Sequence, residues 1–239
     1  PADNAQGGGK VGAAIFIFGS IITCALALLI STPFSIASAI FMTEISPGIG
    51  RKILQPAVEI FVGIPSVVYG WIGLTILVPF IKDLFDLKFG FSVLAAGIVL
   101  AVMIYPTITS LSADAIRSIP KSFRQASYGL GATRWQTISQ VVIPASKSGL
   151  MTAIVLGLAR AFGEALAVAM VIGKMKAFPE SLLSPTTNLT AAIASDMGGA
   201  MEGSEYNIAL WSMALLLFII SLVFIFIIHY ISAKGGHKA

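Results

Sequence analysis

The sequence predicts an all-α protein that crosses a membrane several times, and three observations lead to this fold class. Hydrophobic residues make up 56% of the 239 residues, whereas charged residues make up only 11%. The mean hydropathy is +0.92. Soluble domains carry about 25% charged residues, so this chain has too few charges to cover a surface that faces water. The third observation is a set of long apolar segments, each with about the 20 residues that a helix needs to cross the hydrocarbon core.

Five segments are long enough to span, and proline interrupts several of them. In chain order they are residues 11–41, 54–81, 91–110, 148–173 and 208–231. Pro33, Pro65 and Pro106 lie in the first, second and third segments. Proline is tolerated in a membrane helix where neighbouring helices or water satisfy the freed backbone groups. We therefore expect a packed helix bundle of about five spans.

The basic residues are distributed unequally between alternate loops, which predicts the orientation of the chain. One side holds most of them, with few carboxylates: Arg51, Lys52, Arg117, Lys121, Arg124, Arg134, Lys147, Lys234 and Lys238. The other side holds fewer basic residues and most of the acidic ones. Cytoplasmic loops carry the excess of Lys and Arg, so we expect the C-terminus in the cytoplasm. The net charge of +4 does not indicate nucleic-acid binding, because these residues flank apolar segments without interleaved aromatics.

Two connections between the spans are long enough to have structure of their own. The expected cytoplasmic connection, residues 112–147, has Pro120 and Pro144 near its ends and reads as two short helices around Gly129 and Gly131. The expected external connection, residues 174–207, contains a candidate short helix. Thr187 or Asn188 would cap this helix and Gly198 would end it.

The cytoplasmic connection contains a spaced motif. Gln125, Ala126 and Ser127 are followed after three residues by Gly131, and then after nine residues by Val141, Ile143 and Pro144. This order resembles the coupling-loop motif of ABC importer permeases, which reads E-A-A, three residues, glycine, nine residues and I-x-L-P. Gln125 and Ser127 depart from the glutamate and the second alanine. The stretches PAVEIFVGIPSVVYGWIGL, YPTITSLSADAIRSIP and ARAFGEALAVAMVIG are similar to the phosphate permease subunits of this group, the PstC family.

The resemblance implies a non-catalytic permease core that moves phosphate and receives mechanical work from an ATPase. It implies four partner chains: a second permease similar to PstA, two ATPase subunits similar to PstB and an external phosphate-binding protein similar to PstS. The chain itself has no G-x-x-x-x-G-K loop, so we expect it not to bind ATP. We expect no cofactor and no metal. In the coupling loop, Gly131 would permit a turn and Pro144 would stop the loop helix before the next span.

The expected domains are a polar segment, residues 1–10, and an importer transmembrane domain, residues 11–239. Permeases of this family usually carry one more helix before the segment that begins near Val11, and ten polar and small residues stand in its place here. Two alternatives to phosphate import remain open. The cargo could be another oxyanion, such as sulfate or molybdate, or the protein could be a channel or secondary transporter that does not use ATP.

Arg160 and Glu164 are the candidate residues for the substrate path, because charges are costly inside an apolar span and usually face a cavity or a partner. Their spacing predicts that they lie on one face of a helix. Either they form an ion pair that only neutralises itself, or Arg160 attracts the anion. Glu164 would then accept a hydrogen bond from protonated phosphate and repel sulfate. Ser66 and Tyr69, beside the Pro65 interruption, are further candidates for the path.

Overall fold

The computed structural model describes residues 13–236, in which every named element is a helix. The predicted polar segment, residues 1–10, lies outside the described residues. Five stretches of the described chain are long and apolar enough to cross a membrane: Ala14–Ile45, Ser66–Leu84, Val93–Arg117, Arg134–Gly163 and Glu205–Ile227. The predicted all-α, polytopic membrane architecture is therefore confirmed.

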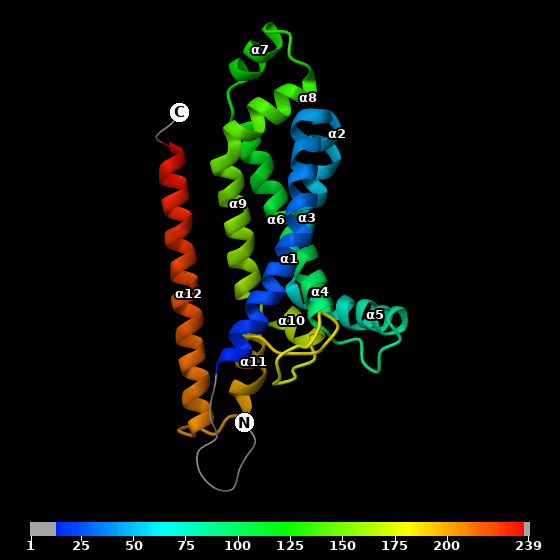
Figure 1. Ribbon diagram of the computed structural model, residues 1–239, viewed down its shortest axis with the longest axis vertical. Helices are drawn as coiled ribbons and strands as arrows, with labels where there is room; N and C mark the ends of the chain where they lie inside the picture. Colours follow the sequence, from blue (N-terminus) through cyan, green and yellow to red (C-terminus); the bar gives the residue numbers. More distant parts are fainter. Residues whose placement is uncertain (1–12, 237–239) are drawn as a thin grey trace. The chain divides into compact units, whose positions relative to one another are not determined.

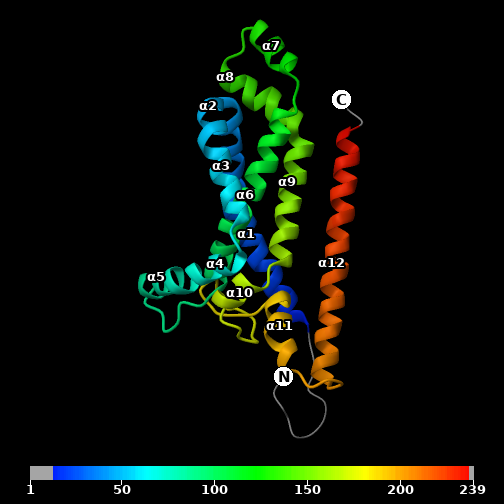
Figure 2. The ribbon, with the colours of Figure 1, turned by 180° about the vertical axis from the view of Figure 1, so that it is seen from behind.

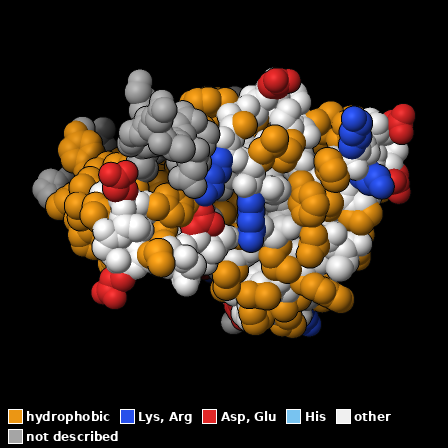
Figure 3. All heavy atoms as spheres, turned by 90° about the horizontal axis from the view of Figure 1, so that it is seen from below, with side chains coloured by type: hydrophobic (Ala, Val, Ile, Leu, Met, Phe, Trp, Pro, Cys, Tyr) orange, Lys and Arg blue, Asp and Glu red, His pale blue; other side chains and the backbone are white. Residues whose placement is uncertain are grey.

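The surface is suited to lipid rather than to water. In the window of the last span only 11% of the residues are buried, and its exposed side chains include Trp211, Leu215 and Phe218. Figure 3 shows the molecule from below, a face on which hydrophobic side chains are widespread and charged side chains are fewer, several of them together at one edge. Apolar exposure on this scale is expected where hydrocarbon replaces water as the solvent.

The chain divides into two compact units. The first unit takes in Pro1–Leu26, Pro65–Leu100 and Phe162–Leu222, and the second takes in Ala27–Ile64, Ala101–Ala161 and Val223–Ala239. The long helices α1 (Ala14–Ile40), α6 (Val93–Arg117) and α12 (Glu205–Gly236) run through both units.

In the first unit, α4 (Ser66–Ile72) packs against α10 (Leu166–Val171), as Figure 1 shows. A Cβ atom at Gly70 would lie 2.8 Å from both the Cα atom of Ala167 and the sulfur of Met170, so this contact requires glycine. The π-helix η3 (Gly73–Leu77) and α5 (Val78–Leu84) continue the chain from α4.

A second contact region of the first unit joins α1, α12 and α11 (Leu189–Asp196) around a small hydrophobic core. Its buried residues are Phe16, Leu189, Ala192, Leu210 and Met213. Asn188 caps α11, because its side-chain oxygen accepts a hydrogen bond of 2.8 Å from the backbone N–H of Ala191. The sequence left Thr187 and Asn188 open as caps, and the structure selects Asn188.

In the second unit, the end of α1 continues through η1 (Phe41–Ile45), α2 (Pro47–Ile49), η2 (Gly50–Leu54) and α3 (Gln55–Gly63). After α6 come α7 (Lys121–Gly129), α8 (Arg134–Gln136), η4 (Thr137–Val142) and α9 (Ile143–Gly163). Figure 2 shows α2, α7 and α8 at the same end of this unit. The hydrophobic core of the second unit lies between α1, α6, η4 and α9, and its buried residues include Ala39, Ile40, Ile116, Ile138 and Val142.

Close helix packing in the second unit depends on small residues of α9. A Cβ atom at Gly157 would lie 2.5 Å from the Cγ1 atom of Ile108, and one at Gly149 would lie 2.5 Å from the Cβ atom of Ala115. Both partners lie on α6. Small residues bring membrane helices close enough for van der Waals packing, which replaces the hydrophobic effect in lipid.

Two predicted spans differ from the structure. The segment 54–81 is divided at Ile64 and Pro65, whose ψ angles of 127° and 138° are not helical. Proline disfavours the α conformation of the residue before it, and here Ile64 is extended, so the membrane-length stretch begins only at Ser66.

The other difference concerns the segment 148–173, which was predicted as one helix. The membrane-length helix instead covers Arg134–Gly163, and the short helix α10 begins separately at Leu166. Gly163 is a weak helix former, and the carboxylate of Glu164 accepts the N–H of Ala167 in the first turn of α10. The local hydrogen bond therefore starts a new helix where hydropathy alone continues the old one.

Candidate coupling loop and translocation residues

The loop 112–147 turns at Gly131. Helix α7 ends at Gly129, and Gly131 has a φ angle of +82°. No heavy atom lies within 4 Å of the place where its Cβ atom would stand, so the backbone conformation and not crowding requires glycine. Thr133 and Gln136 then form a capping box, in which each side chain accepts the other residue's backbone N–H, and this box starts α8.

The three motif residues on α7 do not face the same way. Gln125 and Ala126 are exposed, whereas Ser127 is buried. The hydroxyl oxygen of Ser127 lies 2.9 Å from that of Thr137, so Ser127 joins α7 to η4. Gln125 and Ala126 are thus open to the surface, and Ser127 holds the two arms of the loop together.

Large apolar side chains surround the exposed part of the motif. Leu130 is 90% exposed and Trp135 is 65% exposed, and Phe123 and Tyr128 are about half exposed. These side chains belong to the loop and not to a membrane-length segment, except Trp135 near the start of the fourth span. Exposed apolar groups gathered on a polar loop are typical of a surface that another protein covers.

Pro144 does not have the predicted role. The chain stays helical from η4 into α9, and Pro144 is the second residue of α9. Proline lacks a backbone N–H, but an N–H in the first turn of an α-helix has no partner within that helix. The preceding turn is a π-helix, in which each bond spans five residues instead of four. Pro144 therefore marks the change from π-helix to α-helix and does not stop the loop helix.

Glu44, at the end of the first span, is bound by two arginines of the loop. The Nε and Nη2 atoms of Arg124 lie 3.0 and 2.5 Å from Glu44 Oε1, and only 18% and 10% of the two side chains are exposed. Arg124 also donates to the carbonyl oxygens of Ile116 and Ile119. Arg134 donates to the carbonyl oxygens of Glu44 and Ile45.

We call this arrangement of Glu44, Arg124 and Arg134 the Glu44 clamp. A forked, charge-assisted pair is among the stronger hydrogen-bonded contacts in proteins, and its position ties the loop to the end of η1. Arg134 adds a cation at the carbonyl end of that helix, where the helix dipole is negative. In the sequence, Arg124 and Arg134 indicated only the orientation of the chain in the membrane. The one sign of a contact with Glu44 was that Glu44 and Asp114 are the only acidic residues among the many basic residues of these loops.

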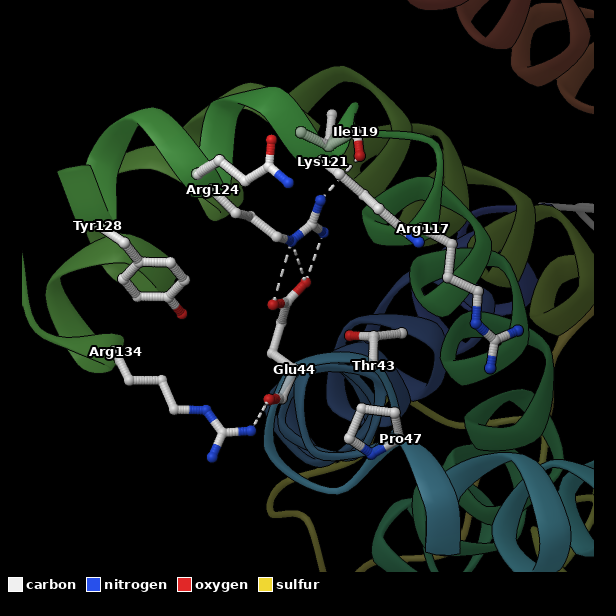
Figure 4. Close-up of a pocket in the computed structure, with 10 residues that line it drawn as sticks. Thr43, Glu44, Pro47, Arg117, Ile119, Lys121, Arg124, Tyr128 and Arg134 are labelled. Atoms are coloured by element: carbon white, nitrogen blue, oxygen red, sulfur yellow. Dashed lines mark hydrogen bonds and ion pairs between the residues drawn. The ribbon is translucent and has the colours of Figure 1, made fainter.

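A cavity of about 580 Å³ opens beside the Glu44 clamp (Figure 4). The residues that line it come from η1, α2, the end of α6 and the loop: Thr43, Glu44, Pro47, Arg117, Ile119, Lys121, Arg124, Gln125, Tyr128 and Arg134. Figure 4 shows Arg124 and Arg134 approaching Glu44 from different sides. We refer to it as the basic cavity.

Arg160, a candidate path residue, lies on α9 in the second unit and is partly buried. Its Nη1 atom donates a hydrogen bond to the hydroxyl of Thr107 on α6. No carboxylate pairs with Arg160 among the ion pairs of the described residues. The hydroxyl of Thr107 therefore orients the guanidinium without neutralising its charge.

Glu164 does not lie on the same helix as Arg160, so the predicted arrangement on one helical face is wrong. It follows the end of α9, in the first unit. Its Oε1 atom accepts the N–H of Ala167 at 3.0 Å, and its carbonyl oxygen accepts the hydroxyl of Thr190 at 2.6 Å. These bonds fix Glu164 between the starts of α10 and α11.

Ser66 and Tyr69 are also in the first unit, on α4. Ser66 is the first residue of that helix and is partly buried, and Tyr69 is 8% exposed. Because α4 packs along α10, the first unit brings the helix of Ser66 and Tyr69 against the helix that Glu164 caps. Arg160 belongs to the other unit.

In the predicted external connection, a polar network holds Lys176, Asp196 and Tyr206. The Nζ atom of Lys176 lies 2.9 Å from Asp196 Oδ2 and donates to the Tyr206 hydroxyl at 2.8 Å, and this hydroxyl donates to Asp196. Burial opposes the charge on Asp196, but the bonds from Tyr206 and Lys176 outweigh it and lower the pKa of Asp196. Burial likewise opposes the charge on Lys176, and its bonds to Tyr206 and Asp196 raise the pKa of Lys176. The network joins the connection to α11 and α12.

Comparison with known proteins relates this geometry to a transport family. The family described as "Binding-protein-dependent transport system inner membrane component" matches residues 31–235. A probable ABC transporter permease protein of Bacillus subtilis, YqgH, is 56% identical over 225 residues, which are 94% of this chain and 73% of the relative. The phosphate transport system permease protein PstC of Haemophilus influenzae is 37% identical over 231 residues, which are 89% of this chain and 73% of that protein.

Solved structures share the fold at low sequence identity. A chain of the inward-facing MetNI methionine ABC transporter aligns with a TM-score of 0.69 and 19% identity, over 95% of this chain and 99% of that one. A chain of a bacterial alginate ABC transporter aligns with a TM-score of 0.61 and 16% identity, over 92% and 78% of the two chains. The chain therefore belongs to the binding-protein-dependent transport system inner membrane components, the ABC importer permeases that work with a partner ATPase and a substrate-binding protein.

Proposed function

We propose that the chain is the permease subunit of an ATP-driven phosphate importer. The observation that carries this proposal is the set of relatives named phosphate transport system permease protein PstC, which are 35–38% identical over most of the chain. Its partners would be a second permease similar to PstA, two ATPase subunits similar to PstB and an external phosphate-binding protein similar to PstS. The chain would contribute half of the translocation path and would not hydrolyse ATP itself.

The charge of Arg160, in the last turn of a membrane-length helix, supports an anionic cargo. Among the described residues no carboxylate pairs with the guanidinium of Arg160, and such a group would attract an oxyanion in a low-dielectric path. Ser66 and Tyr69 would supply hydroxyls to the path. Glu164 would accept a hydrogen bond from hydrogen phosphate, which carries a proton, and would repel sulfate, which carries none.

The name of YqgH, which is 56% identical, gives no substrate, so another oxyanion remains as the alternative cargo. Uptake into proteoliposomes distinguishes phosphate from another oxyanion as the cargo. The complete transporter, with ATPase and binding protein, is expected to accumulate labelled phosphate only when ATP is supplied on the ATPase side. Accumulation of sulfate or molybdate in place of phosphate would assign the alternative. Phosphate flux without ATP and binding protein would contradict an importer of this class.

The proposed orientation places the loop 112–147 and the C-terminus in the cytoplasm and residues 174–207 outside, where the binding protein docks. The excess of basic residues on one side supports it. The Lys176–Asp196–Tyr206 network would give the external connection a fixed shape for docking.

Cysteine labelling tests this orientation. Cysteine at Glu202, an exposed position, should react in intact cells with a thiol reagent that cannot cross the membrane, whereas cysteine at exposed Ser122 should react only after lysis. The native Cys24 is 2% exposed, so labelling of the chain without an added cysteine measures the background signal. Ser204 lies close by but is a poorer position for the cysteine, because its hydroxyl accepts the N–H of Asn207 at the start of α12. The opposite labelling pattern would reverse the proposed topology.

Gly131→Val is expected to reduce ATP-dependent uptake several-fold, because a side chain at a positive φ costs about 1–2 kcal/mol and more for a β-branched residue. The strain would displace Gln125 and Ala126 from their positions for the ATPase. Gly129→Val is the matched control, since Gly129 ends α7, has no positive φ and has equally open space around it. Equal uptake rates in the two variants, at equal amounts of assembled transporter, would show that the turn is unimportant.

A further inference from the structure

The basic cavity has more positive charge than its internal contacts use. Four basic side chains line it, Arg117, Lys121, Arg124 and Arg134, against one carboxylate, Glu44. Arg124 engages that carboxylate directly. Three cations therefore remain around a space of about 580 Å³, which is within the range of about 300–1,000 Å³ that is usual for small-molecule sites.

Two of these cations, Arg117 and Lys121, are poorly compensated. Arg117 pairs with Asp114 at 3.4 Å, but the side chains are 36% and 65% exposed, and exposed pairs contribute little. Lys121 has no ion pair among the described residues. Figure 4 shows the Lys121 side chain running toward Arg117. An anion that met both cations would gain two charge-assisted contacts.

The arginines of the Glu44 clamp are fixed before any ligand arrives. Arg134 uses its Nη2 atom for the carbonyl oxygens of Glu44 and Ile45, and the remaining N–H groups of that guanidinium have no protein partner among the described hydrogen bonds. A guanidinium whose orientation is already set loses little entropy on binding, and its planar fork matches the oxygens of a phosphate group.

The cavity lies where two membrane-length helices end. Thr43 and Glu44 belong to the last turn of the span Ala14–Ile45, and Arg117 is the last residue of the span Val93–Arg117. A helix leaves the hydrocarbon core toward the end of a membrane-length stretch, so such ends lie in or beyond the headgroup region. Basic pockets at that level bind the headgroups of anionic lipids.

From these contacts we propose that the basic cavity binds a phosphate group, carried either by an anionic phospholipid or by free inorganic phosphate. Arg117 and Lys121 supply the free charge, and Arg134 supplies an oriented guanidinium beside it. The site lies in the second unit alone and does not depend on which cargo the transporter imports.

The test uses the complete transporter with its ATPase, purified in detergent. A fluorescent short-chain phosphatidylglycerol is titrated, with the matching phosphatidylcholine as the uncharged probe. Each Lys or Arg near a membrane surface strengthens anion binding by roughly a factor of five, so Arg117→Gln with Lys121→Gln should bind phosphatidylglycerol about 25-fold more weakly. The single variant Lys121→Gln should lie between this variant and the wild type.

The matched control removes the same charge outside the cavity. Lys52 and Lys147 are exposed and do not line it, so Lys52→Gln with Lys147→Gln should bind phosphatidylglycerol as the wild type does. Inorganic phosphate, added as a competitor at millimolar concentration, separates the two sources. Displacement of the lipid identifies free phosphate as a ligand, and binding of phosphatidylglycerol without displacement assigns the headgroup.

Three results would overturn the proposal. Equal weakening in the cavity variant and the control variant would show that only diffuse charge attracts the lipid. Failure of both phosphatidylglycerol and inorganic phosphate to bind the wild type would leave the cavity without this ligand. Loss of the ATPase from the purified cavity variant would mean that these cations meet the partner protein instead.

Discussion

Replacing Arg160 by glutamine is expected to stop phosphate uptake while the transporter still assembles. Glutamine can keep a hydrogen bond to Thr107, so the packing of α9 on α6 should survive. The positive charge is lost, and an anion in a low-dielectric path then has no counter-charge from this helix. Removing one partner from a desolvated charge contact costs about 2–5 kcal/mol, which corresponds to a loss of at least about 30-fold in uptake.

Uptake of labelled phosphate, normalised to co-purified ATPase, measures this effect. Thr107→Val is the matched control, because it removes the hydrogen-bond partner of Arg160 and leaves its charge. This control should keep most of the activity. Normal uptake in Arg160→Gln would mean that the arginine only packs between helices.

The sequence predicted the spans because hydropathy is a property of whole segments. It also predicted the turn at Gly131 and limited the cap of α11 to Thr187 or Asn188, since each depends on a few neighbouring residues. It failed at Gly163, where one side-chain hydrogen bond from Glu164 starts a new helix inside a continuous apolar segment. Pro144 was misread for a related reason, because the preceding π-helix makes a proline acceptable at that point.

The Glu44 clamp could not be predicted from the sequence at all. Arg124 and Arg134 are 80 and 90 residues from Glu44 along the chain. Charge counting predicts the side of the membrane on which a basic residue lies, but it does not distinguish a paired arginine from a solvated one. Only packing of the second unit brings the end of η1 against both arms of the loop, so this contact emerges only in three dimensions.

The Glu44 clamp gives the first span a direct connection to the loop that would dock on the ATPase. Motion of α7 would be transmitted through Arg124 to the Glu44 side chain, and motion of α8 through Arg134 to the backbone of η1. A contact that carries force between two elements must be stiff. The forked bonds and the low exposure of Arg124 and Glu44 meet that condition.

Glu44→Gln is therefore expected to uncouple transport from ATP hydrolysis. The amide keeps the size of the side chain but loses the charge, and a hydrogen bond to a charged group contributes about 1.5–3 kcal/mol. We expect about tenfold less phosphate transported per ATP hydrolysed, with the ATPase still bound. Asp114→Asn is the matched control, because it neutralises the exposed partner of Arg117 and should leave this ratio unchanged.

A double-mutant cycle separates transmission from simple loss of stability. If Glu44 and Arg124 act as one connection, the Arg124→Gln variant and the double variant should lose about as much coupling as Glu44→Gln alone. Independent contributions would instead multiply, and the double variant would be far worse than either single one. An unchanged ratio of phosphate to ATP in Glu44→Gln would show that the pair only holds the loop in place and that force reaches the first span by another route.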